Sequence, residues 1–90
     1  MFRFNYHPNA FLNSTKNIQP GLISRTKIID VLEDGVFKTT KISKKAELSY
    51  PVVLYHLHLL ETEKIVRHIG KRRYLWELTG AGQQRLIHNL

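Results

Sequence analysis

Basic side chains are the most prominent chemical groups in this chain. Its 90 residues carry 14 Lys and Arg against seven Asp and Glu, giving a formal net charge of +7 and a sequence pI near 10.0. Residues 38–73 contain nine of the basic and three of the acidic residues, and so hold six of the seven net positive charges. Such a segment attracts polyanions, meaning nucleic acid or an anionic membrane. The alternative is a solvated basic surface on an ordinary domain.

Catalytic and metal-binding patterns are absent from the sequence. The five histidines show no i, i+4 pair and no His-Glu-x-x-His spacing. Cysteine is absent, which excludes disulfides and thiolate metal sites. We therefore expect no enzyme activity, no cofactor and no metal site; a site shared across a dimer through His7 or His88 is the alternative.

The elements that position these groups must fit into one small domain. A chain of this length buries roughly 60–65% of its unfolded surface, which suffices for one modest core. No apolar run approaches the roughly 20 residues of a membrane span, and the N-terminus lacks the apolar core of a signal peptide. We expect a soluble, cytoplasmic protein that does not contact membranes.

Two helices are predicted in the first half of the domain. Apolar residues at three- to four-residue spacing predict a helix over residues 22–33, which Gly35 ends. Thr39 or Thr40 is expected to cap a second, short helix over residues 40–47. The segment between the two helices is a turn or a very short strand.

Residues 1–21 are expected to form an N-terminal arm, and residues 22–90 the folded domain. Pro, Gly and Asn interrupt any long regular structure in the arm, including Pro20 and Gly21 at its end. Its aromatic residues favour docking on the domain or on a second subunit. A partly disordered tail is the alternative.

A third helix is predicted over residues 49–63, with Ser49 as its N-cap. Val53, Leu57 and Leu60 lie within an arc of about 60° on a helical wheel and predict the face that is buried in the core. Leu54 and Leu59 lie to either side of this face. They either pack against neighbouring helices or form a surface that binds another protein.

A two-stranded hairpin follows, over residues 66–78, with its turn at Gly70 and Lys71. Thr79 then caps a last helix over residues 80–89. The predicted order is therefore arm, helix, short helix, helix, hairpin and helix.

In this order and spacing, the stretch from Thr39 to Leu78 resembles the winged helix-turn-helix of ArsR-like and related small transcriptional regulators. The matching features are these: the Ser49 cap, the Val53, His56, Leu57, Leu60 and Glu61 spacing, the Ile65-Val66 pair before the wing, Gly70, and the Tyr74 to Thr79 run followed by Gly82. The resemblance implies an α+β winged helix-turn-helix with three helices, a two-stranded β wing and a C-terminal helix, behind an N-terminal arm. The resemblance does not extend to metal sensing through cysteines, because the chain has none.

The resemblance also implies duplex DNA binding by a homodimer that pairs through the arm, the first helix and the C-terminal helix. In such folds the second helix of the motif lies in the major groove. The predicted DNA contacts are Lys38, Thr40, Lys41, Lys44 and Lys45 before that helix, Ser49, Tyr50, Pro51, Val52, Tyr55 and His58 on it, and Lys71, Arg72 and Arg73 on the wing.

Base recognition by this helix is predicted to be modest. No Arg, Lys, Asn or Gln occurs between Ser49 and Thr62, and these are the usual bidentate readers of guanine and adenine. Affinity is expected to come from phosphate contacts, with readout of DNA shape as one possibility. A non-specific architectural or chromatin DNA-binding protein and a winged-helix protein-interaction module are the alternatives to a transcriptional regulator.

Overall fold

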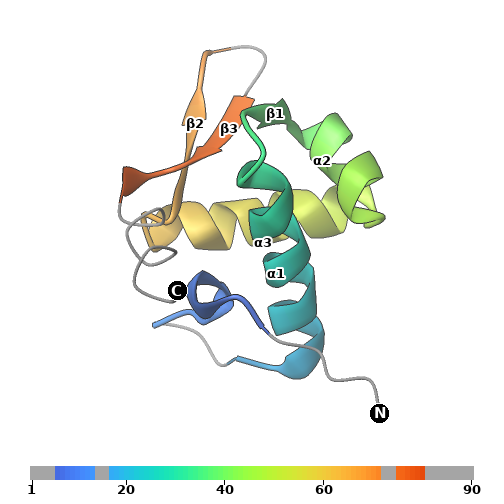
Figure 1. The fold of residues 1–90 in the computed structure, drawn as a ribbon, viewed down its shortest axis with the longest axis vertical. Coiled ribbons are helices and arrows are strands. Elements are labelled where there is room, and N and C mark those ends of the chain that lie inside the picture. The colour runs from blue at the N-terminus through green and yellow to red at the C-terminus, as the bar shows by residue number, and fades with distance from the viewer. Residues whose placement is uncertain (1–5, 14–16, 72–74, 81–90) are drawn as a thin grey trace.

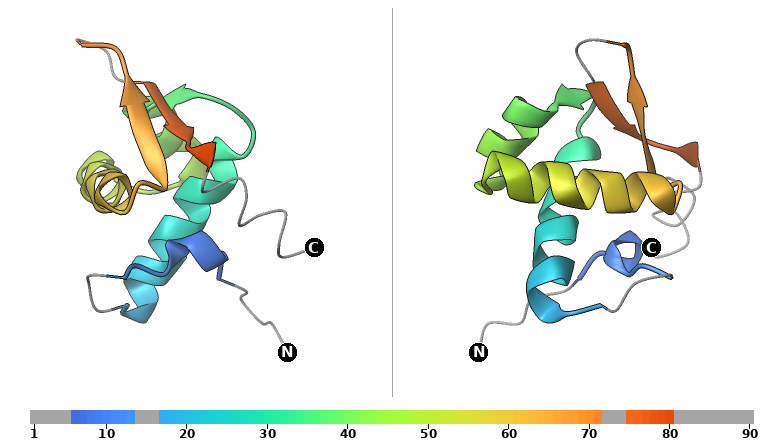
Figure 2. Two further views of the ribbon diagram at one scale, coloured as in Figure 1. Left: turned by 90° about the vertical axis from the view of Figure 1, so that its left-hand side faces the viewer. Right: turned by 180° about the vertical axis from the view of Figure 1, so that it is seen from behind.

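The computed structural model describes residues 6–13, 17–71 and 75–80 (Figure 1). Its elements are, in order, the 3-10 turn η1 (Pro8–Ala10), α1 (Gln19–Leu32), β1 (Phe37–Lys38), α2 (Thr39–Ala46), α3 (Tyr50–Thr62), β2 (Val66–Ile69) and β3 (Leu75–Leu78). α3 crosses α1, and the β2–β3 hairpin extends from the side of α3 away from the N-terminal segment (Figures 1 and 2). The predicted C-terminal helix over residues 80–89 falls almost entirely outside the described residues.

The first helix begins earlier than predicted. α1 starts at Gln19 rather than at residue 22, and Pro20 and Gly21 lie in its first turn instead of interrupting it. Proline is tolerated there because the first N–H groups of a helix have no intrahelical acceptor. The prediction that Pro20 and Gly21 interrupt regular structure was therefore wrong.

The second and third helices lie within one residue of their predicted bounds. Lys38, not a threonine, occupies the N-cap position of α2, and its side chain makes no capping hydrogen bond. Thr39 instead lies inside the helix and is buried. Ser49 occupies the N-cap position of α3 as predicted, although its hydroxyl makes no capping hydrogen bond.

The sheet has three antiparallel strands in the order β1-β3-β2. The predicted hairpin corresponds to β2 and β3, and the two residues of β1 add the third strand at the outer edge of β3. Gly70 follows β2 with φ 95°, a left-handed conformation that glycine adopts without strain. Trp76 pairs with Phe37 on one side and with His68 on the other.

The hydrophobic core lies where the three helices and the sheet meet. Val53, Leu57 and Leu60 are fully buried, which confirms the core face predicted for α3. Leu54 and Leu59 are partly buried and pack against this core. Within the part of the chain that the structure describes, no helix is long and apolar enough to cross a membrane.

The described part of the N-terminal segment docks on its own domain. Ala10 and Leu12 are buried in the core, and the backbone N–H of His7 donates a 3.0 Å hydrogen bond to Thr26 Oγ1. The His7 ring also contacts Glu33 through Nε2 at 2.9 Å. Residues 6–12 are thereby fixed along α1.

Candidate nucleic-acid interface

The outward face of α3 carries aromatic, apolar and hydroxyl groups rather than charges. All the contact residues predicted on this helix and at its N-cap are exposed: Ser49, Tyr50, Pro51, Val52, Tyr55 and His58. Tyr55 has 60% of its surface exposed, more than Tyr50 or Val52. This face offers single hydrogen bonds and apolar contacts to a ligand, but no bidentate base reader.

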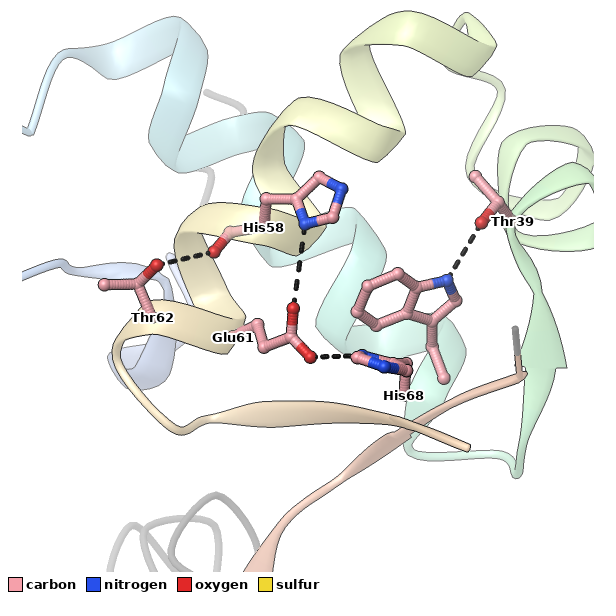
Figure 3. Close-up of polar contacts among 6 residues, drawn as sticks. Thr39, His58, Glu61, Thr62 and His68 are labelled. Carbon is pink, nitrogen blue, oxygen red and sulfur yellow. Dashed lines mark hydrogen bonds and ion pairs between the residues drawn. The ribbon is translucent and has the colours of Figure 1, made fainter. Parts of the chain in front are cut away.

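A buried tryptophan connects α3, the wing and α2 (Figure 3). Trp76 is fully buried, and its indole N–H donates a 2.9 Å hydrogen bond to Thr39 Oγ1. The rings of His58 and His68 lie edge-on to the indole, with centroids 5.8 and 5.6 Å from it. Glu61 hydrogen-bonds His68 Nδ1 and lies 3.6 Å from His58 Nδ1. These contacts fix the position of the wing relative to α3.

The basic groups of the wing differ in how much charge they present. Arg67 of β2 is paired across the sheet with Glu77 of β3, which neutralises its charge locally. Lys71 is exposed just after Gly70. Arg72 and Arg73, the other predicted wing contacts, lie outside the described residues.

All five predicted contacts around α2 are solvent-exposed. Exposed side chains on and just before this helix are Lys38, Thr40, Lys41, Lys44 and Lys45. Lys45 differs from the others because its ammonium lies 5.2 Å from the centre of the Phe37 ring. It also lines an open groove between α1 and α2 together with Asp30, Asp34 and Glu47. Lys41 and Lys44 are therefore the α2 lysines with the least compensated charge.

The basic elements lie toward one end of the molecule. The wing and α2 both lie on the side of the fold away from η1 and the N-terminal segment. α3 runs between these two elements and η1 (Figures 1 and 2). A surface that combines lysines from α2, the exposed face of α3 and the wing suits a rod-like polyanion.

His56 is buried on the side of α3 that faces α1. Burial, with a further contribution from the charge of Arg25, lowers the pKa of His56 to about 4. His56 is therefore neutral at pH 7 and adds no positive charge to the surface.

Sequence reasoning missed the three contacts that hold this surface in shape. Arg25 and His56 form a hydrogen bond although they are 31 residues apart in the sequence, and Trp76 and Thr39 do so at a separation of 37 residues. Neither pair could therefore be recognised from a local spacing pattern. The ion pair between Arg67 and Glu77 was missed for another reason: a turn at Gly70 and Lys71 would place Arg67 opposite residue 74, whereas the strands pair Ile69 with Leu75 and Arg67 with Glu77. Among the described residues, no group of three or more His, Asp or Glu is placed to hold a metal ion.

Comparison with solved structures identifies the fold. The chain is similar to the Zalpha domain of PKZ from Carassius auratus, solved in complex with Z-DNA, with 29% sequence identity and a TM-score of 0.58. That match covers 63% of this chain and 92% of the Zalpha chain.

A second similar structure is a homodimeric winged helix-turn-helix DNA-binding domain from Mycobacterium bovis, a possible ArsR-family transcriptional regulator. The TM-score is 0.64 at 19% identity, over 73% of this chain and 62% of that chain. No family model and no curated protein matches the sequence. The fold is thus an α+β winged helix of the kind found in DNA-binding domains.

Proposed function

We propose that this protein binds duplex DNA through α3, the wing and the lysines of α2. The observation that supports this most directly is that α2, with its exposed lysines, and the wing lie toward the same end of the fold, next to α3 and its exposed uncharged side chains. The similarity to a domain solved in complex with Z-DNA supports DNA binding. We propose a binding role and no enzymatic one, because no catalytic pattern occurs in the sequence.

The salt dependence of binding tests this proposal. A protein that neutralises about six phosphates gives a log–log slope of affinity against salt near −5. The measurement is fluorescence anisotropy with a labelled 20-base-pair duplex from 50 to 300 mM NaCl. A slope shallower than about −2 would contradict a phosphate-binding surface of this size.

The manner of recognition is proposed to be shape readout rather than base readout. The exposed face of α3 has no bidentate base reader, and the Carassius auratus domain was solved with left-handed DNA. A second candidate function is therefore selective binding of left-handed duplex. Parallel titrations with a methylated alternating dC-dG duplex, first in its left-handed and then in its right-handed form, test this, with circular dichroism reporting the handedness. Preference by tenfold or more for the left-handed form supports the candidate, and equal affinity contradicts it.

We further propose a homodimeric, ArsR-like regulator in the cytoplasm as the most specific role. The similar Mycobacterium bovis domain is homodimeric and a possible member of that family. Light scattering at tens of micromolar protein checks the dimer, and a monomer mass would contradict it. Selection from random duplex DNA checks regulation, because a regulator should prefer one sequence by about 10³ or more at physiological salt. Uniform recovery of sequences would instead favour an architectural protein.

A further inference from the structure

Arg25 carries a buried positive charge that no carboxylate of the described residues neutralises. Its residue is 3% exposed, and none of the ion pairs among the described residues includes it. Its hydrogen-bond partners are all neutral: Nε donates to Ala10 O at 2.5 Å, Nη2 to Asn17 Oδ1 at 3.1 Å and Nη1 to His56 Nδ1 at 3.3 Å. Burial also lowers the pKa of Arg25. A buried guanidinium without an anion is costly, because it has lost its hydration without gaining a counter-charge.

A cavity of about 260 Å³ lies against this guanidinium, between the start of α1 and α3. Ile18, Pro20, Leu59 and the ring of Tyr55 form the apolar part of its walls, beside Gly21, Arg25 and His56. Ile18 and Tyr55 are 59% and 60% exposed, so they form a rim that opens to solvent. The cavity therefore combines an apolar wall with one cation.

The lack of a side chain at Gly21 leaves room for the Arg25 guanidinium beside this cavity. A Cβ at Gly21 would lie 2.8 Å from Arg25 Nη1 and 3.5 Å from His56 Cε1, and all three residues line the cavity. Arginine has five N–H groups, and the hydrogen bonds of Arg25 use three of them. A planar carboxylate matches the donor geometry of a guanidinium.

We propose that this cavity binds a small organic carboxylate with a flat apolar body, held by Arg25 and covered by Tyr55 and Leu59. The site shares Tyr55 with the proposed DNA-binding surface, but it is inferred from the burial and contacts of Arg25 and does not rest on DNA binding. A ligand with about nine heavy atoms is expected to bind with a dissociation constant on the order of 1 mM.

Titration with benzoate, followed by amide NMR, tests the site on the full chain. Benzamide is the matched neutral probe, and inorganic phosphate is the anion without an apolar body. Saturable shifts that centre on Gly21, Tyr55 and Leu59 with benzoate, and that are at least tenfold weaker with both other probes, support the proposal. Equal binding of benzamide, equal binding of phosphate, or shifts confined to the surface lysines would overturn it.

Two variants locate the interaction at Arg25. Arg25→Met removes the cation, and Gly21→Ala adds a methyl that displaces the guanidinium while favouring the helix. Both are expected to weaken benzoate binding at least tenfold. Gly80→Ala is the control, since its added Cβ would have no neighbour within 4 Å among the residues that the structure describes. If Arg25→Met does not fold, Gly21→Ala decides alone, and unchanged benzoate affinity in that variant contradicts the site.

Discussion

At the scale of single residues, a few long-range polar contacts in the core position the wing. The hydrogen bond between Trp76 and Thr39 joins β3 to the first turn of α2. It lies in a buried setting, where loss of an acceptor is not compensated by water. The same indole is flanked by the rings of His58 and His68. One tryptophan therefore relates three elements of the proposed DNA-binding surface.

Thr39→Val tests that contact. The substitution keeps the shape of the side chain but removes the oxygen that accepts from the indole, and we expect it to lower the free energy of unfolding by about 1–3 kcal/mol. Urea denaturation measures the change. Thr40→Val is the matched control, because Thr40 is exposed on the same turn, and its effect should stay within about 0.5 kcal/mol. Equal effects of the two variants would count against a special role for Thr39.

His56 makes the stability of the fold depend on pH. Its pKa is lowered to about 4 in the folded protein, below the ordinary value of 6.5, so the unfolded chain binds the proton more tightly. The stabilisation is complete above pH 6.5 and is lost as the pH falls toward 4. Between pH 7.5 and 5.0 we expect the contribution of His56 to fall by about 2 kcal/mol.

His56→Asn provides the comparison for this pH dependence. Asparagine keeps an acceptor for Arg25 near the position of Nδ1 but does not titrate. The variant should be less stable at pH 7.5, and its urea-derived free energy should change less between pH 7.5 and 5.0 than that of the unchanged protein. The same pH slope in both proteins would show that His56 is not the responsible group.

At the scale of elements, the N-terminal segment acts as part of the domain. Leu12 is 4% exposed within the common core, whereas its neighbour Phe11 is 43% exposed. Leu12→Ala is expected to cost about 2–4 kcal/mol of unfolding free energy, through lost burial and the cavity left behind. Phe11→Ala should cost less than half as much in the same urea titration. If Leu12→Ala has no effect, the segment does not dock in solution.

Elements that bury a periodic apolar face were predictable from the sequence, and those defined by distant partners were not. Val53, Leu57 and Leu60 gave the core face of α3 through their spacing alone. The start of α1 was misplaced because Pro20 suggests a break outside its structural context, although it is compatible with a first turn. β1 is only two residues long, so no alternation within it indicates a strand.

The residues of the candidate surface were also predictable where the signal is local, and not where it depends on distant partners. The exposed residues of α3 and the lysines of α2 followed from sequence, because helix periodicity and charge are local properties. The contacts of Arg25 with Ala10 and His56 depend on how three segments meet in space. Charged residues in an amphipathic helix are usually solvated, and only the structure shows that this one is buried.

At the scale of the whole molecule, the distribution of charge decides how DNA would bind. Lys41 and Lys44 are exposed on α2 next to α3, while Lys27 is exposed on α1 and lines the groove that holds Asp30 and Asp34. The double substitution Lys41→Ala with Lys44→Ala is expected to make the log–log salt slope shallower by about 2. Lys27→Ala should leave the slope unchanged. If Lys27→Ala reduced the salt slope by as much as each of the two α2 substitutions does, binding would depend on the net charge of the protein rather than on this surface.

The pairing of β1 with β3 also has a consequence for the order in which the chain folds. Phe37 and Trp76 are partners in the sheet, yet α2 and α3 lie between them in the sequence. Closing so long a loop is entropically costly, whereas each helix is built from local contacts. We therefore expect the helices to assemble in the folding transition state, and the third strand to join only afterwards. Substitutions in β1 should then accelerate unfolding while leaving the folding rate almost unchanged.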